Sequence, residues 1–119
     1  PPLRVIALTD NQSIITATGN DVSFVHVFSR QLRHLGKSKD LLIAVSASGN
    51  SPNVLACVEA ARQLGVTTVA FTGFDGGQLA TMVDLLVHVP TRQGAYGPVE
   101  DVHLMINHMI TERLKFFKE

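Results

Sequence analysis

The chain has 119 residues, of which 45% are hydrophobic and 17% are charged. This length suits one compact core and is too short for two domains, and the composition excludes a disordered chain. Ten lysines and arginines balance ten aspartates and glutamates, which excludes a general electrostatic attraction to nucleic acid or to an anionic membrane. No apolar run reaches the roughly 18 residues that a membrane-spanning helix needs. The bulk properties predict a soluble single domain over residues 1–119.

The first elements in chain order are expected to be a strand and a helix. Residues 4–9 form an apolar run closed by the turn formers Asp10 and Asn11, which is typical of a buried strand. From Asp21 onward, apolar residues recur every three or four positions up to Gly36, which predicts an amphipathic helix with a glycine after its last turn.

The middle of the chain repeats this order with clearer signals. Residues 41–45 form a continuous apolar run, as in a strand buried on both faces. Ser51 and Pro52 suit the N-cap and the first position of a helix that ends at Gly65. Cys57 lies within this helix, where a small buried side chain is favoured over a reactive thiol, and a free cysteine fits a reducing cytoplasm.

The remaining elements continue the alternation of strands and helices. They are a strand at 66–72, a glycine-rich turn at 73–77, a short helix around 79–83, a strand at 85–89, a loop at 91–98 and a helix from about 99 to 117. Such alternation predicts an α/β fold with a doubly wound parallel sheet in three layers, similar to that of flavodoxin. Ligands of such sheets bind beyond the carboxyl ends of the strands.

One of these strand ends carries an unusual turn, Ser46-Ala47-Ser48-Gly49-Asn50-Ser51, which we call the serine turn. Three hydroxyls lie there at the start of a helix, where free N–H groups and the helix dipole favour an anion such as phosphate. The alternative is a plain strand-to-helix turn in which Ser51 only caps the helix. A serine nucleophile is a weaker alternative, because the Gly-x-Ser-x-Gly elbow is absent.

Longer stretches around this turn resemble the sugar-isomerase (SIS) domain family. They are Asp40-Leu-Leu-Ile-Ala-Val-Ser-Ala-Ser-Gly-Asn-Ser-Pro-Asn-Val, Ala60-Ala-Arg-Gln-Leu-Gly, Phe71-Thr-Gly-Phe-Asp-Gly-Gly and Thr18-Gly-Asn-Asp. Within the family, the chain is most similar to phosphoheptose isomerases and to relatives that associate with the DnaA replication initiator. The resemblance implies that Ser46, Ser48 and Ser51 hold a sugar phosphate together with the backbone of Ala47.

The same resemblance implies that Asn20 and Asp21 lie near the sugar. From the residues alone, a helix cap before Val22 is an equally good interpretation of this pair.

The last predicted helix carries Glu100, His103 and His108. Each has an ordinary explanation as a solvated or interface side chain. Spacing alone favours Glu100 and His103 as partners, since Glu100 and His108 lie roughly 12 Å apart along a helix axis. The resemblance instead implies that Glu100 contacts substrate and that Glu100 and His108 contribute to a zinc site. The best-known phosphoheptose isomerases have Gln at the position of Glu100, and the added charge would alter metal affinity.

The resemblance implies a homotetrameric, cytoplasmic enzyme that interconverts sedoheptulose 7-phosphate and an aldose phosphate through an enediol, with His108 as catalytic acid or zinc ligand. The base expected from the family is a Glu in a His-x-x-x-Glu helix upstream of the serine turn, and no such pattern occurs before Ser46. We therefore expect an N-terminally incomplete domain. The alternative is a non-catalytic module that binds a phosphosugar or the DnaA initiator. A dinucleotide-binding protein is excluded because no Gly-x-Gly-x-x-Gly follows a strand.

Overall fold

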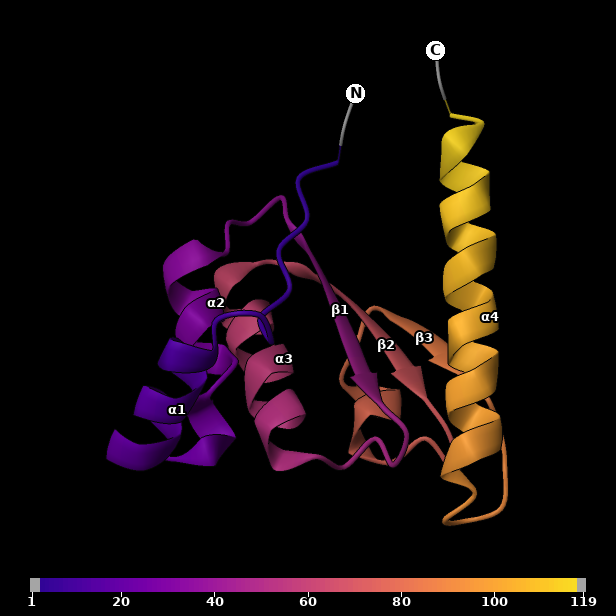
Figure 1. Cartoon of the computed structure of the whole chain (residues 1–119), viewed down its shortest axis with the longest axis horizontal. Coiled ribbons are helices and arrows are strands. Elements are labelled where there is room, and N and C mark those ends of the chain that lie inside the picture. The colour runs from indigo at the N-terminus through magenta and orange to yellow at the C-terminus, as the bar shows by residue number, and fades with distance from the viewer. Residues whose placement is uncertain (1–2, 118–119) are drawn as a thin grey trace.

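The computed structural model describes residues 3–117 and shows a parallel sheet flanked by helices (Figure 1). In chain order the elements are α1 (Gln12–Asp21), the 3-10 helix η1 (Phe24–His26), α2 (Ser29–Leu35), β1 (Leu41–Ser46), α3 (Pro52–Leu64), β2 (Thr67–Thr72), the 3-10 helix η2 (Gln78–Thr81), β3 (Leu85–His88) and α4 (Tyr96–Lys115). This order confirms the predicted parallel α/β class. Within residues 3–117, no helix has the combined length and apolar character to cross a membrane.

The three strands lie in the order β1-β2-β3, and both pairs are parallel. In this register Ser46 at the end of β1 pairs with Thr72 at the end of β2, which pairs with His88 at the end of β3. The carboxyl ends of all three strands therefore meet at one edge of the sheet, and the serine turn leaves β1 at this edge.

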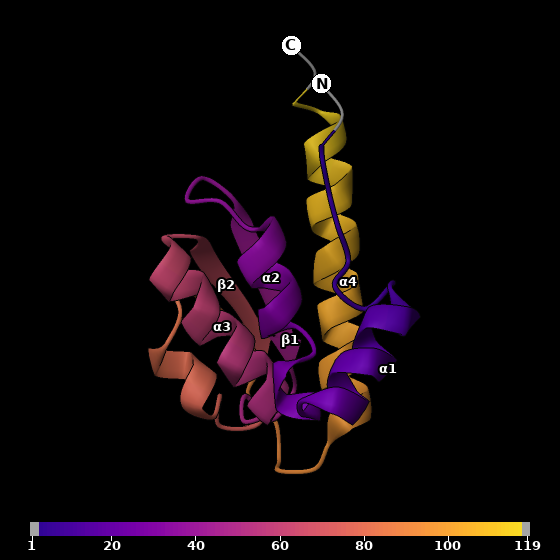
Figure 2. The ribbon, with the colours of Figure 1, turned by 90° about the vertical axis from the view of Figure 1, so that its left-hand side faces the viewer.

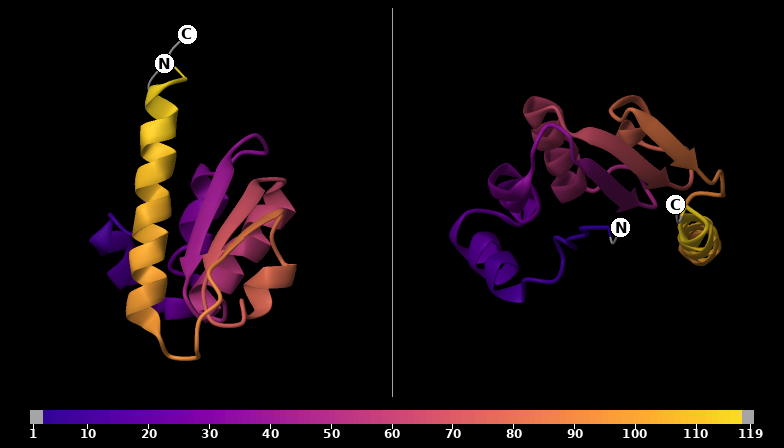
Figure 3. Two further views of the ribbon diagram at one scale, coloured as in Figure 1. Left: turned by 90° about the vertical axis from the view of Figure 1, so that its right-hand side faces the viewer. Right: turned by 90° about the horizontal axis from the view of Figure 1, so that it is seen from above.

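The two faces of the sheet are covered differently. Viewed from above, α3 and η2 lie on one side, whereas α4 and the segment before α1 lie on the other (Figure 3). Ala44, Val58, Ala70 and Leu79 form a buried cluster on the α3 side. On the opposite face, Leu41, Ile43 and Val45 of β1 are more than half exposed. The described residues thus complete the core on one face and leave apolar side chains uncovered on the other.

A second buried cluster joins α2 to α3, which lie side by side (Figure 2). Cys57 belongs to it and is a free cysteine. Burial raises the pKa of its thiol to about 11, so the side chain is neutral at pH 7. The predicted role of Cys57 as a small buried apolar residue is confirmed.

The predicted strand at residues 4–9 is wrong. Residues 4–7 lie outside any helix or strand, residues 8 and 9 belong to a turn, and Leu3, Val5 and Ile6 are largely exposed. An apolar run becomes a strand only where a neighbouring strand accepts its backbone hydrogen bonds. None of the described residues supplies such a neighbour here.

The helix expected from Asp21 to Leu35 is also divided differently. Its amino-terminal part is η1 and its carboxyl-terminal part is α2, whereas α1 lies earlier in the chain and was not predicted. Gly36 has a φ of −75°, so it does not use the left-handed conformation expected of a capping glycine. Gly65 after α3 does, with a φ of +69°, as predicted.

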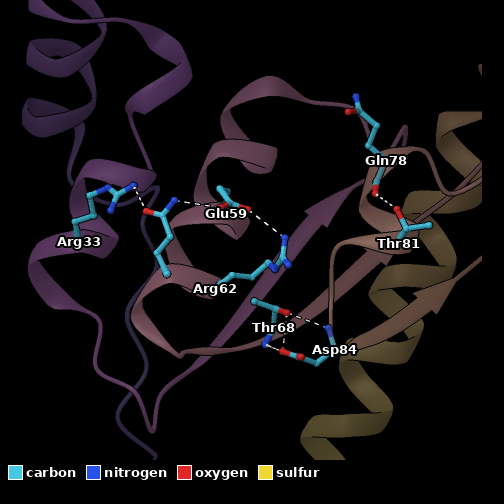
Figure 4. Close-up of polar contacts among 8 residues, drawn as sticks. Arg33, Glu59, Arg62, Thr68, Gln78, Thr81 and Asp84 are labelled. Atoms are coloured by element: carbon cyan, nitrogen blue, oxygen red, sulfur yellow. Dashed lines mark hydrogen bonds and ion pairs between the residues drawn. The ribbon is translucent and has the colours of Figure 1, made fainter.

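Polar side chains form hydrogen bonds between neighbouring helices and strands (Figure 4). Arg33 of α2 donates to Gln63 of α3 over 2.8 Å. Asp84, just before β3, accepts hydrogen bonds from both the N–H and the hydroxyl of Thr68, over 2.7 and 2.8 Å. These bonds lower the pKa of Asp84. Because a depressed folded-state pKa favours the ionised form, this contribution to stability is present above the ordinary pKa of 3.8 and is lost as the pH falls through the lower value.

Candidate phosphosugar site

The serine turn connects the buried end of β1 to the first turn of α3. Ser46 is the last residue of β1, Ser51 is the N-cap of α3, and Pro52 occupies the first helical position. The Gly49 N–H donates to the Ser46 carbonyl over 2.9 Å and closes a tight turn. The sequence therefore predicted both the location of the turn and the start of the helix correctly.

The Ser46 and Ser51 hydroxyls make no capping bond to helix α3. The oxygens of Ser46 and Ser51 lie 3.0 Å apart and share a hydrogen bond. Ser51 occupies the N-cap position, yet its side chain makes no capping bond to a helix N–H. The hypothesis that Ser51 only caps α3 is therefore wrong. Its hydroxyl is directed toward Ser46, at the carboxyl end of β1.

Ser48 contributes a hydroxyl whose proton is not committed to the turn. Its oxygen accepts from the Asn50 N–H over 3.2 Å, so its own hydrogen remains available to a ligand. Within residues 3–117, the backbone N–H groups of Ser48 and Ser51 donate to no protein acceptor. Ser48 and Ser51 are half-buried, so these donors are reachable from solvent. A set of neutral donors at a helix N-terminus is suited to an oxyanion.

A second loop lies beside the serine turn and contacts it. We call residues 73–78 the Gly73–Gln78 loop; it follows β2 and leads into η2. Gly73 donates to the Ala47 carbonyl over 2.8 Å, and Leu79, the residue after the loop, donates to the Gly49 carbonyl over 3.1 Å. The Ala47 carbonyl is thus used within the protein. Sequence analysis identified this loop as a turn and as part of the family resemblance but not as a neighbour of the serine turn, although its Gly76-Gly77 pair is a signal of close backbone approach.

Asn20 and Asp21 lie at the carboxyl end of α1, where the Asn20 amide donates to the Asp21 carboxylate over 3.0 Å. The hypothesis that they cap a following helix is wrong, because Asn11 caps α1 and Ser23 caps η1. Asp21 lines a cavity of about 380 Å³ between α1 and α2. Among the described residues, no hydrogen bond joins this pair to the serine turn.

The three candidate residues of α4 have different surroundings. His103 is buried, with Nε2 3.1 Å from the Thr72 carbonyl and its ring edge-on to Phe71 at 5.6 Å. Glu100 and His108 are exposed. The partnership of Glu100 with His103 that spacing favoured is therefore not formed, because His103 is directed into the core. His103 instead anchors α4 to the end of β2.

The described residues do not by themselves provide a zinc site. Over residues 3–117, no group of three or more His, Cys, Asp or Glu side chains is close enough to hold a metal ion. Glu100 and His108 lie on the same helix, about 12 Å apart along its axis at 1.5 Å per residue. A complete coordination shell would need ligands from another chain or segment.

The sequence is also similar to those of known proteins. Residues 1–73 match the SIS domain family. The chain is 43% identical to a phosphoheptose isomerase of Nitratidesulfovibrio vulgaris (strain Miyazaki F) over 98% of this chain and 55% of that protein. It is 44% identical to one of Rhodospirillum rubrum, over 92% of this chain and 57% of the relative. The chain thus spans about half the length of the curated relatives it matches.

Two solved structures are also similar. The phosphoheptose isomerase of Neisseria gonorrhoeae superposes with a TM-score of 0.85 at 41% identity, covering 90% of this chain and 60% of that one. The phosphoheptose isomerase of Francisella tularensis gives a TM-score of 0.89 at 36% identity, covering 94% of this chain and 59% of the other. Identity at this level extends the likeness from the fold to the sequence.

Proposed function

Because the chain belongs to the SIS domain family, we propose that it binds a sugar phosphate in the serine turn and takes part in isomerising sedoheptulose 7-phosphate to an aldose heptose 7-phosphate. The observation that carries the proposal is the serine turn itself, with three hydroxyls and a helix N-terminus at the carboxyl edge of the sheet. The similarity to proteins named phosphoheptose isomerase supports the choice of substrate.

The physics of the turn favours a phosphate ester over a neutral ligand. The turn contains no Lys or Arg, and neither ion pair of the described residues involves it. Recognition therefore depends on directional hydrogen bonds from Ser46, Ser48 and Ser51 and on the positive end of the α3 dipole. Such a site can hold the dianionic end of a phosphosugar and leave the carbonyl end free to reach catalytic groups.

Replacing Ser48 by alanine tests this site directly. Hydrogen bonds to charged groups contribute about 1.5–3 kcal/mol, so Ser48→Ala is expected to weaken sedoheptulose 7-phosphate binding roughly tenfold or more. Isothermal titration calorimetry measures the change. Thr16→Ala, an exposed hydroxyl on α1 that bonds only to its own helix, is the matched control and should bind normally. Unchanged affinity in Ser46→Ala, Ser48→Ala and Ser51→Ala would contradict the proposed site.

Isomerisation through an enediol requires a base to move a proton between C1 and C2 and an acid to protonate the carbonyl oxygen. Among the residues singled out here, His108 is the proposed acid, because an imidazole can donate a proton near neutral pH. Asn20 and Asp21 are proposed to orient the sugar hydroxyls, and Glu100 to contact the substrate from α4. These four assignments rest on the family resemblance of their positions.

Zinc is part of the proposal only as an ion shared with other ligands. His108 offers a nitrogen and Glu100 a carboxylate, both acceptable to zinc. A bound zinc would polarise the substrate carbonyl. Since the described residues do not complete the shell, the remaining ligands would come from outside them. Elemental analysis of the purified protein tests for the metal.

A second candidate function is a regulatory module that binds a phosphosugar, or the DnaA initiator, without catalysis. The observation that favours it is Glu100, which adds a charge where the best-known enzymes have a neutral Gln. The isomerase and a phosphosugar-binding regulatory module both predict phosphosugar binding through the serine turn. Only the isomerase predicts conversion of sedoheptulose 7-phosphate, so a direct assay of the aldose product separates them.

We further propose that the protein is a cytoplasmic homo-oligomer, with a tetramer as the expected state. The support for the assembly is the apolar surface of α4, where four side chains are more than two-fifths exposed: Leu104, Met105, Met109 and Ile110. Exposed apolar surface of this kind marks an interface. Light scattering is expected to give a mass that is a multiple of the 12.9 kDa chain. Met109→Asp should lower that mass, whereas Glu112→Gln on the same helix should not. A monomer in the unmodified protein would contradict the assembly.

A further inference from the structure

The side chain of Asn50 bridges the serine turn and the Gly73–Gln78 loop, although it is itself exposed. Its Oδ1 accepts from the Gln78 backbone N–H over 3.0 Å, and its Nδ2 donates to the Ser48 carbonyl over 3.1 Å. The two ends of the amide thus face a donor and an acceptor respectively, so only an asparagine-like group satisfies both. The Asn50 backbone N–H also donates to the Ser48 hydroxyl oxygen.

The backbones of the two loops meet at glycines. A Cβ atom on Gly49 would lie 1.9 Å from the Gly76 carbonyl oxygen, and one on Gly77 would lie 2.3 Å from the Ser48 carbonyl oxygen. Both glycines also have positive φ, +64° and +57°. The serine turn is therefore held by direct contact with the neighbouring loop, and Asn50 supplies the side-chain bonds at this contact.

We infer that Asn50 is a positioning residue for phosphate recognition: by joining Ser48 to Gln78, it orients the Ser48 hydroxyl and the free N–H groups of the serine turn toward the phosphate. The inference rests on the proposed function. The role follows from the contacts, because the Asn50 backbone N–H holds the Ser48 hydroxyl oxygen while its side-chain amide holds the Ser48 carbonyl. Freed from Gln78, the Ser48–Asn50 segment would sample orientations in which its donors no longer converge, and binding would have to restore the order.

Two substitutions remove the same bond from opposite sides. Asn50→Ala deletes all three hydrogen bonds of the amide, including a 3.4 Å bond that the Gln78 side chain donates to Oδ1. Gln78→Pro deletes the donating N–H, at the first residue of η2, where proline is tolerated. Each is expected to weaken sedoheptulose 7-phosphate binding about 3- to 10-fold in calorimetry, the effect of one ordinary hydrogen bond. Because both act on one interaction, the double variant should bind little more weakly than the weaker-binding single variant.

Gln78→Ala is the matched control: it removes only the long 3.4 Å bond from the Gln78 side chain to Asn50 Oδ1 and keeps the backbone N–H, so it should bind within about twofold of the unmodified chain. The urea midpoint of unfolding should stay nearly constant in all variants, because Asn50 and Gln78 are exposed. Weaker binding in Asn50→Ala with normal binding in Gln78→Pro would overturn the positioning role and indicate direct ligand contact. Normal binding in both variants would overturn it as well.

Amide hydrogen exchange separates this inference from the proposed function. The Leu79 N–H is bonded to the Gly49 carbonyl across the two loops, so it should exchange several-fold faster in Asn50→Ala and Gln78→Pro but not in Gln78→Ala. If the unmodified chain binds no sedoheptulose 7-phosphate while exchange changes as expected, the proposed function fails and the contact between the loops stands. Unchanged Leu79 exchange would overturn the inference even if the phosphosugar binds.

Discussion

Replacing Gly49 by alanine is expected to destabilise the protein by about 3 kcal/mol and to abolish phosphosugar binding. Gly49 is buried and has a φ of +64°, which is strained for a residue with a side chain. Its added Cβ would also lie 1.9 Å from the Gly76 carbonyl oxygen and 3.1 Å from the Gly77 Cα. Neither obstacle is a flexible side chain, so the two loops would have to separate. Urea unfolding measures the first effect and calorimetry the second.

Two other glycines provide graded controls for Gly49→Ala. Gly94 also has a positive φ, +83°, but nothing lies within 4 Å of a Cβ built there, so Gly94→Ala should cost only about 1 kcal/mol of backbone strain. Gly97 lies in α4 with open space around it and no positive φ, so Gly97→Ala should be neutral or slightly stabilising. Equal destabilisation at Gly49 and Gly94 would show that the contact with Gly76 has no cost of its own.

The segment from β1 to β2 could be predicted because its signals are local. The apolar run at 41–45, the Ser51-Pro52 start and the Gly65 stop each act within a few residues, and each is present in the structure. By contrast, α1 contains Thr and Gly and has no strong apolar face. Its start is stabilised by Asn11, whose side chain accepts from the Ile14 N–H over 3.1 Å. That signal is short and was not separable from a turn.

The candidate site was predictable in part for the same reason. The serine turn is one continuous stretch, so its hydroxyls and the helix start are visible in the sequence. The contribution of the Gly73–Gln78 loop is not visible in the sequence, because the contact of Gly49 with Gly76 joins positions 27 residues apart and depends on the pairing of β1 with β2. The role of His103 was missed similarly. A histidine on an amphipathic helix gives no sign that the Thr72 carbonyl will lie 3.1 Å from its ring nitrogen.

His108 is the residue whose replacement should affect catalysis most. If it donates a proton to the substrate, His108→Ala should lower the rate of sedoheptulose 7-phosphate isomerisation on the order of 10²–10⁴-fold. Binding through the serine turn should change little, because His108 is exposed on α4 and makes no hydrogen bond to the turn within the described residues. The assay follows formation of the aldose phosphate, and Asn107→Ala, the exposed neighbour on the same helix, is the control.

Elemental analysis of the same variants distinguishes the two roles proposed for His108. A fall in both rate and zinc content would make His108 a metal ligand, because loss of the ligand removes the ion that polarises the carbonyl. A fall in rate at constant zinc content would make it the proton donor. A rate equal to that of the unmodified protein would contradict both roles. If a protein that also contains the expected upstream Glu base binds sedoheptulose 7-phosphate but forms no aldose, the regulatory module becomes the better account, since the serine turn would then hold a signal and not a substrate.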